Sequence, residues 1–185
     1  NQGTMIDERD GREYKTIGIK SQMWMAENLN YADSINYPSL KGNSSCFDDD
    51  IANCEKYGRV YRWGAVVDSI CPKEWHVPSA DEYEELLLNV GILPCRNYTC
   101  SVNSSKYYEG YELQAVGYDN WPNATDTYGF SVIPFFNDVF SGLSAHFWSS
   151  TQGLYLALIN NWTYLWNASK GDTPSIGLSV RCLKD

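Results

Sequence analysis

The sequence predicts a single α+β domain that is stapled by three disulfides. Three observations point to this fold class: one strongly marked helix, many short strands joined by long loops, and six cysteines. A chain of 185 residues buries about 70% of the surface that it exposes when unfolded, which is enough for one core. No internal repeat or linker divides the sequence, so we expect residues 1–185 to form one domain.

The clearest element is a helix over residues 80–90. Ser79 stands at the N-cap and Glu82 follows three residues later, which is the capping-box pattern. Gly91 comes directly after the helix, where a left-handed residue commonly ends one. The apolar stripe of this helix has the spacing i, i+3, i+4 and i+7 and consists of Tyr83, Leu86, Leu87 and Val90.

Short strands are expected in both halves of the chain. Residues 14–25 read as a strand pair, and residues 128–136 as a strand broken by Pro134. A short helix is expected at residues 63–67, and a loop over residues 34–53. The remaining strands are predicted at residues 146–149, 154–159, 162–166 and 176–183.

The last of these strands shows the strongest alternation. Ile176, Leu178 and Val180 fall on one face, and Cys182 continues it. This pattern predicts a C-terminal strand with one buried face.

The six cysteines fit three disulfides, with fifteen possible connectivities. Two pairs lie close in sequence, Cys46 with Cys54 and Cys95 with Cys100, and neither has the spacing of a zinc site. Oxidised cysteines imply an exported protein. The sequence contains no recognisable signal peptide or membrane span, so we take it as a mature or trimmed form that does not insert directly into a membrane.

The composition limits the class of partner. The net charge is −9 and the pI is about 4.6. Nucleic acid and anionic membrane surfaces need clusters of Lys and Arg, and none is visible, so neither is an expected partner. Aromatic residues make up 15% of the chain and are mostly Tyr and Trp, which suit a core and also a ligand face.

Several segments together resemble the Fibrobacter succinogenes major paralogous domain. They cover nearly the whole chain in order and are DERDGREYKTIGIKSQMWMAENLNY (7–31), CFDDDIANCEKYGRVYRWGAVVDS (46–69), CPKEWHVPSADEYEELL (71–87), DTYGFSVIP (126–134), FWSST (147–151) and GLSVRCLKD (177–185). Two positions depart from the family pattern: Glu74 replaces a glycine, and Phe135-Phe136 replaces a small-residue turn.

This resemblance implies a fold and a location. Members of the family are grouped with C-type-lectin-like and formylglycine-generating-enzyme-like domains, and they occur on the surfaces of Fibrobacter and Bacteroidetes cells. The likeness pairs Cys71 with Cys182, which leaves the two short rings Cys46–Cys54 and Cys95–Cys100. It implies a surface-exposed, ligand-binding module without a settled activity.

Catalytic residues are not evident. A nucleophile needs a base within hydrogen-bond reach. His76 sits in a family motif beside Trp75 and Pro78 and is expected to be a packed structural residue, and His146 has no recognisable partner. The reactive cysteine pair of the formylglycine-generating relatives is not matched, because Cys182 is assigned to the bridge. We therefore expect no enzyme activity.

The acidic ring closed by Cys46 and Cys54 is a possible calcium site. Calcium binds six to eight oxygens, and Asp48, Asp50 and Asn53 supply such groups. The spacing is not that of an EF-hand, and a solvated acidic turn is the competing interpretation. Calcium is thus the only cofactor that the sequence suggests.

The aromatic stripe Trp162, Tyr164 and Trp166 is the main candidate for a ligand site. Alternation on a strand places the three rings on one face, about 13 Å from end to end. Core packing of the same stripe is the alternative. The residues expected to complete this face are Trp121, Tyr128, Asn161 and Asn167.

The function expected from these features is non-catalytic binding at a bacterial cell surface. Flat rings stack on the apolar faces of sugars, and amides bind hydroxyls, so a plant-type polysaccharide is the favoured ligand. Two alternatives remain open: an assembly subunit of a surface appendage that binds protein partners, and a diversified receptor-binding lectin-like domain.

Overall fold

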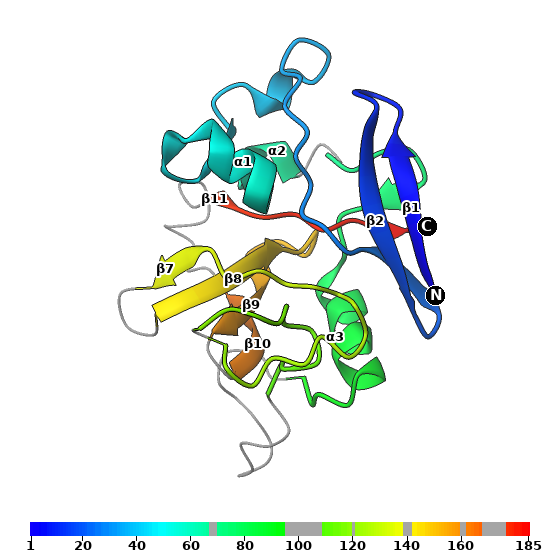
Figure 1. Ribbon diagram of the computed structural model, residues 1–185. Helices are drawn as coiled ribbons and strands as arrows, with labels where there is room; N and C mark the ends of the chain where they lie inside the picture. The colour runs from blue at the N-terminus through cyan, green and yellow to red at the C-terminus, as the bar shows by residue number, and fades with distance from the viewer. Residues whose placement is uncertain (67–69, 95–108, 120, 139–141, 160–161, 168–176) are drawn as a thin grey trace.

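The computed structural model describes residues 1–66, 70–94, 109–119, 121–138, 142–159, 162–167 and 177–185. This part of the chain contains three small antiparallel sheets and few helices, which confirms the α+β class (Figure 1). The helices are α1 (Ile51–Tyr57), α2 (Trp63–Val66) and α3 (Ala80–Asn89), with 3-10 turns at Pro38–Leu40 and Phe47–Asp49.

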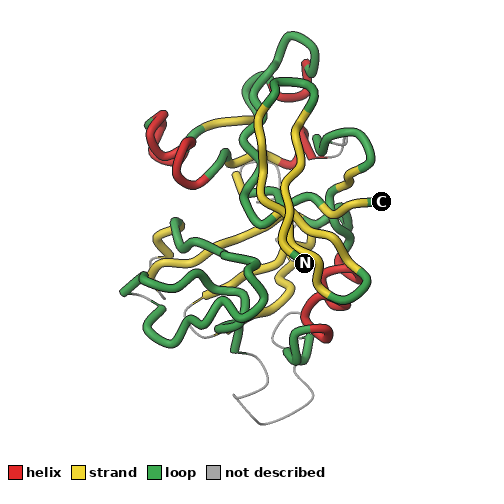
Figure 2. The backbone as a smooth tube through the Cα atoms, turned by 45° about the vertical axis from the view of Figure 1, so that its right-hand side comes forward, coloured by secondary structure: helices red, strands yellow, loops and turns green. Residues whose placement is uncertain are grey.

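The first sheet joins both ends of the described chain. Its strand order is β1-β2-β3-β12-β6. The hairpin of its first two strands stands at one side of the molecule and runs upright through the view of Figure 2. The strands are β1 (Gln2–Asp7), β2 (Arg12–Ile19), β3 (Gln22–Met25), β12 (Leu183–Lys184) and β6 (Trp75–His76).

Two further sheets complete the fold. One has the order β10-β9-β8-β7 and is called sheet C below, and the other has the order β11-β5-β4. Sheet C consists of β10 (Trp162–Asn167), β9 (Leu154–Ile159), β8 (Gly142–Trp148) and β7 (Phe136–Asp138). The smaller sheet consists of β11 (Gly177–Leu178), β5 (Val60–Arg62) and β4 (Ser44–Ser45).

Helix α3 forms as its local sequence predicts. The Ser79 hydroxyl accepts the Glu82 N–H at 3.2 Å, and the Glu82 carboxylate accepts the Ser79 N–H at 2.7 Å. The helix ends one residue earlier than expected, because Val90 is the C-cap and Gly91 turns the chain at φ +84°. The stripe of the helix is buried against β3 and sheet C.

The expected strand at residues 128–136 is not continuous. Only Val132, in an isolated bridge with Gln114, and Phe136, at the start of β7, take part in sheet structure. Ser131 has a left-handed backbone at φ +54°, and Pro134 lacks an N–H, so a ladder cannot run through both. The segment instead turns over the core.

The C-terminal strand is also divided. Residues 177–178 and 183–184 pair in different sheets, and Ser179 between them bridges Phe147. Leu178, Val180 and Cys182 are buried as predicted, whereas Ile176 lies outside the described residues. Arg181 on the opposite face is buried as well, which the alternation did not predict.

Two large hydrophobic clusters hold these layers together, and a third, much smaller one surrounds Ala157 and Tyr164 in sheet C. The first packs α3 and Trp24 of β3 against Leu156 and Leu165 of sheet C. The second surrounds Tyr61 and Trp148 and includes the C-terminal segment. The chain crosses between the clusters near its C-terminal end, so the last residues contact both.

Two of the three expected disulfides are confirmed. Cys46 is bonded to Cys54, and Cys71 is bonded to Cys182 across 111 positions of sequence. The predicted pair at positions 95 and 100 lies outside the described residues. These disulfides fit an oxidising environment such as the outside of the cell. Within the described ranges, no helix is long and apolar enough to span a bilayer.

Candidate functional site

Three rungs of cross-strand pairs build the outer face of sheet C. The stripe that was predicted on β10 is confirmed as one face, because Thr163 and Leu165, between its rings, point into the core. Residues paired directly across an antiparallel ladder share a face. The pairs are Trp162 with Ile159, Tyr164 with Ala157, and Trp166 with Tyr155.

The third strand adds His146 and Trp148 to the same face. His146 pairs with Ala157, and Trp148 pairs with Tyr155. Ring centroids lie 5.5 Å apart for His146 and Tyr155, and 5.8 Å apart for Tyr164 and Trp166. We call the six residues His146, Trp148, Tyr155, Trp162, Tyr164 and Trp166 the aromatic face.

Exposure varies across the aromatic face. The Trp162 side chain is 48% exposed, and Trp166 and Tyr155 are partly buried. Tyr164 is only 7% exposed, and Trp148 is fully buried, where its indole N–H donates to the Tyr61 carbonyl at 2.6 Å. A ligand could therefore reach Trp162 and the edges of its neighbours, while the Tyr164 and Trp148 rings act as support.

Two residues expected on this face lie elsewhere. Trp121 is 1% exposed and belongs to the first core cluster, so its ring is not accessible to a ligand. Tyr128 packs against the same cluster. Sheet C has two faces, and these two residues come from the loop that covers the inner one. Asn167 is exposed at the end of β10, and residue 161 lies outside the described part.

The sequence reasoning missed Tyr155 and His146. Both residues were placed on predicted strands, but the local sequence does not specify which strands pair with each other. Tyr155 alternates with Leu154, Leu156 and Leu158, and that aliphatic row is a signal that Tyr155 faces away from the core. The register that pairs Tyr155 with Trp166 is known only from the folded sheet.

Two of the three oxygen-bearing side chains proposed for the acidic ring take part in local contacts in the described structure. Asp50 caps α1 by accepting the Ala52 N–H at 2.9 Å, and the Asn53 amide donates to the Phe47 carbonyl at 2.9 Å. Asp48 and Asp49 occupy left-handed turn positions. No three His, Cys, Asp or Glu side chains converge anywhere in the described ranges. The ring is thus built from local helix-capping and turn contacts.

His76 links helix α3 to the end of the chain. Its Nδ1 lies 2.6 Å from an Asp185 carboxylate oxygen, and its Nε2 lies 2.9 Å from a Glu82 oxygen. Burial alone would lower the pKa of His76, but the hydrogen bonds and negative charges of these two carboxylates raise it. Both ring nitrogens are engaged in this way, so the imidazole has a structural role.

Protonated His76 should stabilise the fold in a defined pH range. Because its pKa is raised in the folded state, its contribution is complete below about pH 6.5 and is lost as the pH rises through the folded pKa. We expect His76→Gln to lower Tm more at about pH 5.5 than at about pH 9. The His76 side chain is one-third exposed, so its contribution to the free energy of unfolding stays below about 1 kcal/mol. Equal Tm differences at both pH values would contradict this assignment.

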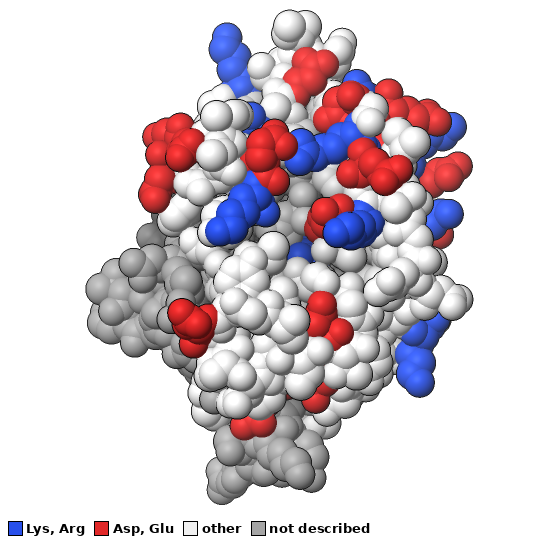
Figure 3. Space-filling view, viewed as in Figure 1, with Lys and Arg blue, Asp and Glu red and all other residues white. Residues whose placement is uncertain are grey.

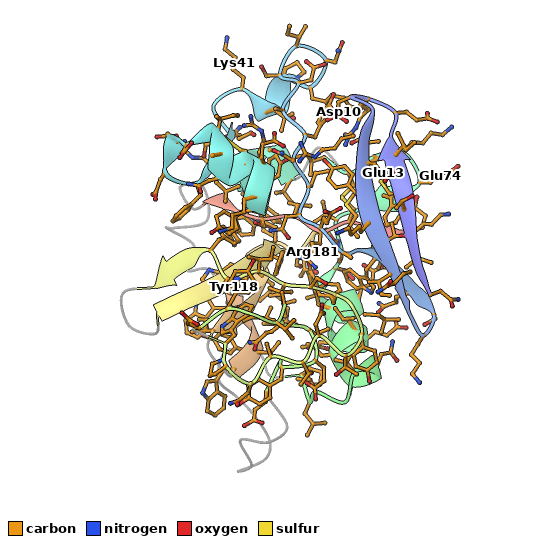
Figure 4. All side chains as sticks on the ribbon, in the orientation of Figure 1. Asp10, Glu13, Lys41, Glu74, Tyr118 and Arg181 are labelled. Carbon is orange, nitrogen blue, oxygen red and sulfur yellow. A yellow bond between two sulfur atoms is a disulfide. The ribbon has the colours of Figure 1, made fainter. Side chains whose placement is uncertain are left out.

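Arg181 is a buried cation near the centre of the molecule (Figure 4). Its side chain donates to Asn28 Oδ1 at 2.8 Å, to the Ser131 carbonyl at 3.0 Å and to the Phe130 carbonyl. The guanidinium also lies 4.7 Å from the centre of the Phe130 ring. Burial lowers its pKa to about 10, with Tyr83, Asp126 and Glu27 opposing that effect. Arg181 therefore remains charged at neutral pH and ties three segments together.

The small groove above Arg181 is rimmed by charges of both signs. Its volume is about 190 Å³. Arg12 on one side forms an ion pair with Glu55 on the other, at 3.2 Å. Figure 3 shows basic and acidic side chains intermixed over this half of the molecule, whereas the opposite half is poor in charge. The mixture of signs gives the groove no preference for an anion or a cation.

The described structure is a disulfide-stapled α+β domain, in which one long-range bridge ties the segment before β6 to the segment before β12. The chain belongs to the Fibrobacter succinogenes major domain family, whose model matches residues 17–184. A search of curated proteins and a search of solved structures found no match.

Proposed function

We propose that this domain is a non-catalytic binding module that works outside the cell and holds plant-type polysaccharide on the aromatic face. The observation that carries the proposal is the position of Trp162. This large apolar ring is half exposed at the end of an antiparallel sheet, and Trp166 and Tyr155 continue the same surface.

Rigid rings at an exposed edge suit a neutral glycan. A sugar presents flat C–H faces that pack on aromatic rings, and a ring already fixed by its neighbours loses little entropy on binding. The Trp166 ring lies against the Tyr164 ring, which is almost completely buried, with the two ring centroids 5.8 Å apart.

Location and fold detail are part of this proposal. The two disulfides support export, and the family supports the bacterial cell surface as the place of action. We also propose a C-type-lectin-like arrangement, supported by the bridge from Cys71, just before α3, to the final strand segment. No metal takes part in the proposed binding.

Trp162→Ala should weaken retention on insoluble cellulose or xylan by about tenfold, equal to about 1.4 kcal/mol. Because the ring is half exposed, its loss should move Tm by no more than about 3 °C. The measurement is a depletion isotherm at several polysaccharide loadings. Retention should be unaffected by chelator and should depend weakly on salt, since an uncharged ligand leaves little to screen.

Ile35→Ala is the matched control, because Ile35 is a large exposed apolar residue outside sheet C. It should leave both retention and Tm unchanged. Tyr164→Ala separates support from contact: it should lower Tm strongly, because the ring is buried. Unchanged retention in a folded Trp162→Ala protein would reject the polysaccharide proposal and favour a protein partner, as expected for an appendage subunit.

A further inference from the structure

Strand β1 forms an open edge of the first sheet. It pairs with β2 on one side, and no strand in the described part of the chain pairs with its other side. An edge of this kind presents a row of backbone donors and acceptors to any strand that comes alongside.

The register shows which backbone groups point outward. The Gly18 N–H donates to the Asn1 carbonyl at 2.9 Å, so this pair is a hydrogen-bonded one. Pairs alternate along an antiparallel ladder, and therefore Gly3 and Met5 also direct their backbone groups toward β2. The outward N–H and C=O groups belong to Gln2, Thr4 and Ile6. None of the hydrogen bonds found among the described residues uses them.

The edge also lacks the features that usually block strand pairing. Proteins protect edges with Lys, Pro or a bulge. The β1 sequence QGTMID contains no Lys or Pro, and its register with β2 is unbroken over all six residues. Ile6 is 59% exposed.

One end of β1 is held in place by its own contacts. The Arg9 side chain donates to both carboxylate oxygens of Asp7, at 2.8 and 2.7 Å, and to the Ile70 carbonyl at 2.8 Å. Asp7 is fully buried. The strand is therefore ordered before any partner arrives, which reduces the entropy cost of pairing.

We propose that a second copy of this chain pairs with β1 about a two-fold axis at Thr4. The outward residues 2, 4 and 6 are symmetric about position 4. Antiparallel pairing then places Thr4 opposite Thr4 of the partner subunit, and Gln2 opposite Ile6 of the partner subunit. The Thr4 pair and the two symmetry-related pairs of Gln2 with Ile6 each exchange two backbone hydrogen bonds, and the two five-stranded sheets become one.

The side chains fit this register. Gly3 lies opposite Met5 of the partner subunit in a close, non-hydrogen-bonded pair, and the absence of a side chain on Gly3 leaves room for the methionine. A groove of about 570 Å³ runs along residues 3–9, so this face is open. Asp7 faces Asn1 of the partner subunit, and no two like charges stand opposite each other, which would otherwise oppose pairing.

The test is sedimentation equilibrium of the full chain from about 10 µM to about 1 mM. The mass of the wild type should rise from 21.0 kDa toward twice that value. Thr4→Lys should weaken association at least tenfold, because two ammonium groups would face each other across the axis. Thr4→Ala keeps the backbone N–H and should associate like the wild type.

Hydrogen exchange locates the interface. In the wild type, the amides of Thr4 and Ile6 should exchange more slowly as the concentration rises, and in Thr4→Lys they should not. A wild type that stays monomeric over the whole range overturns the proposal, and so does a Thr4→Lys protein that associates equally well. The inference is independent of the aromatic face, because Trp162→Ala should leave the association unchanged.

Discussion

Arg181→Met should lower the free energy of unfolding by about 2–4 kcal/mol. The substitution removes the donors of two buried acceptors, Asn28 Oδ1 and the Phe130 carbonyl, and of the partly buried Ser131 carbonyl. Each buried acceptor left without a donor costs about 1–3 kcal/mol. Burying a methionine side chain costs less desolvation free energy than burying a guanidinium. This difference offsets part of the loss but does not replace the hydrogen bonds.

Urea unfolding followed by tryptophan fluorescence measures the effect. Arg12→Met is the matched control, since Arg12 forms an exposed ion pair with Glu55 and should cost at most about 1 kcal/mol. Arg181→Lys keeps the charge but cannot reach three acceptors with one ammonium, so it should still be clearly destabilised. An Arg181→Met protein as stable as Arg12→Met would show that the buried contacts contribute little.

Removing the long disulfide with the double variant Cys71→Ala, Cys182→Ala should cost about 4–5 kcal/mol. The bond joins residues 111 positions apart, and in the chain-entropy model a long loop restricts the unfolded chain most. It also fixes the C-terminal segment, where Val180 and Cys182 are fully buried between the other elements.

The stability effect of the long disulfide can be compared with that of the short Cys46–Cys54 disulfide. Cys46 and Cys54 are 8 positions apart, and their double Ala variant should cost about 2–3 kcal/mol under the same conditions. Urea midpoints of the two variants, measured without reductant, give the order directly. If the short ring proved the more costly to remove, native-state packing rather than loop closure would control the stability of this domain.

Local sequence predicted the elements whose signals lie within a few residues. Helix α3 follows from the capping box of Ser79 and Glu82, because both hydrogen bonds are made inside its first turn. The shared face of the β10 aromatics follows from alternation alone. Helix α1 and strand β1 were missed, since the first starts in a polar loop at Asp50 and the second has no apolar alternation.

Whether a ring belongs to a ligand face depends on what covers it. Trp162 and Trp121 are the same residue type and both stand among amides in the sequence, yet one is half exposed and the other is buried. Periodicity states which residues share a side of an element, but it contains no information about the opposite layer. The loop over the inner face of sheet C buries Trp121, and no element of the described chain buries Trp162 to the same degree.

Four features could be predicted from the chain alone: the α+β class, a helix that starts at residue 80, the alternation of β9 and β10, and the family. Each of them rests on short-range patterns or on motifs in order. Three features became visible only in the folded chain: Arg181 is internal, β1 is an edge strand among the described residues, and Tyr155 and His146 join the β10 rings. These outcomes depend on pairing between segments far apart in the chain. The free energy of such pairing is set by the surfaces that meet, and local sequence does not specify which surfaces those are.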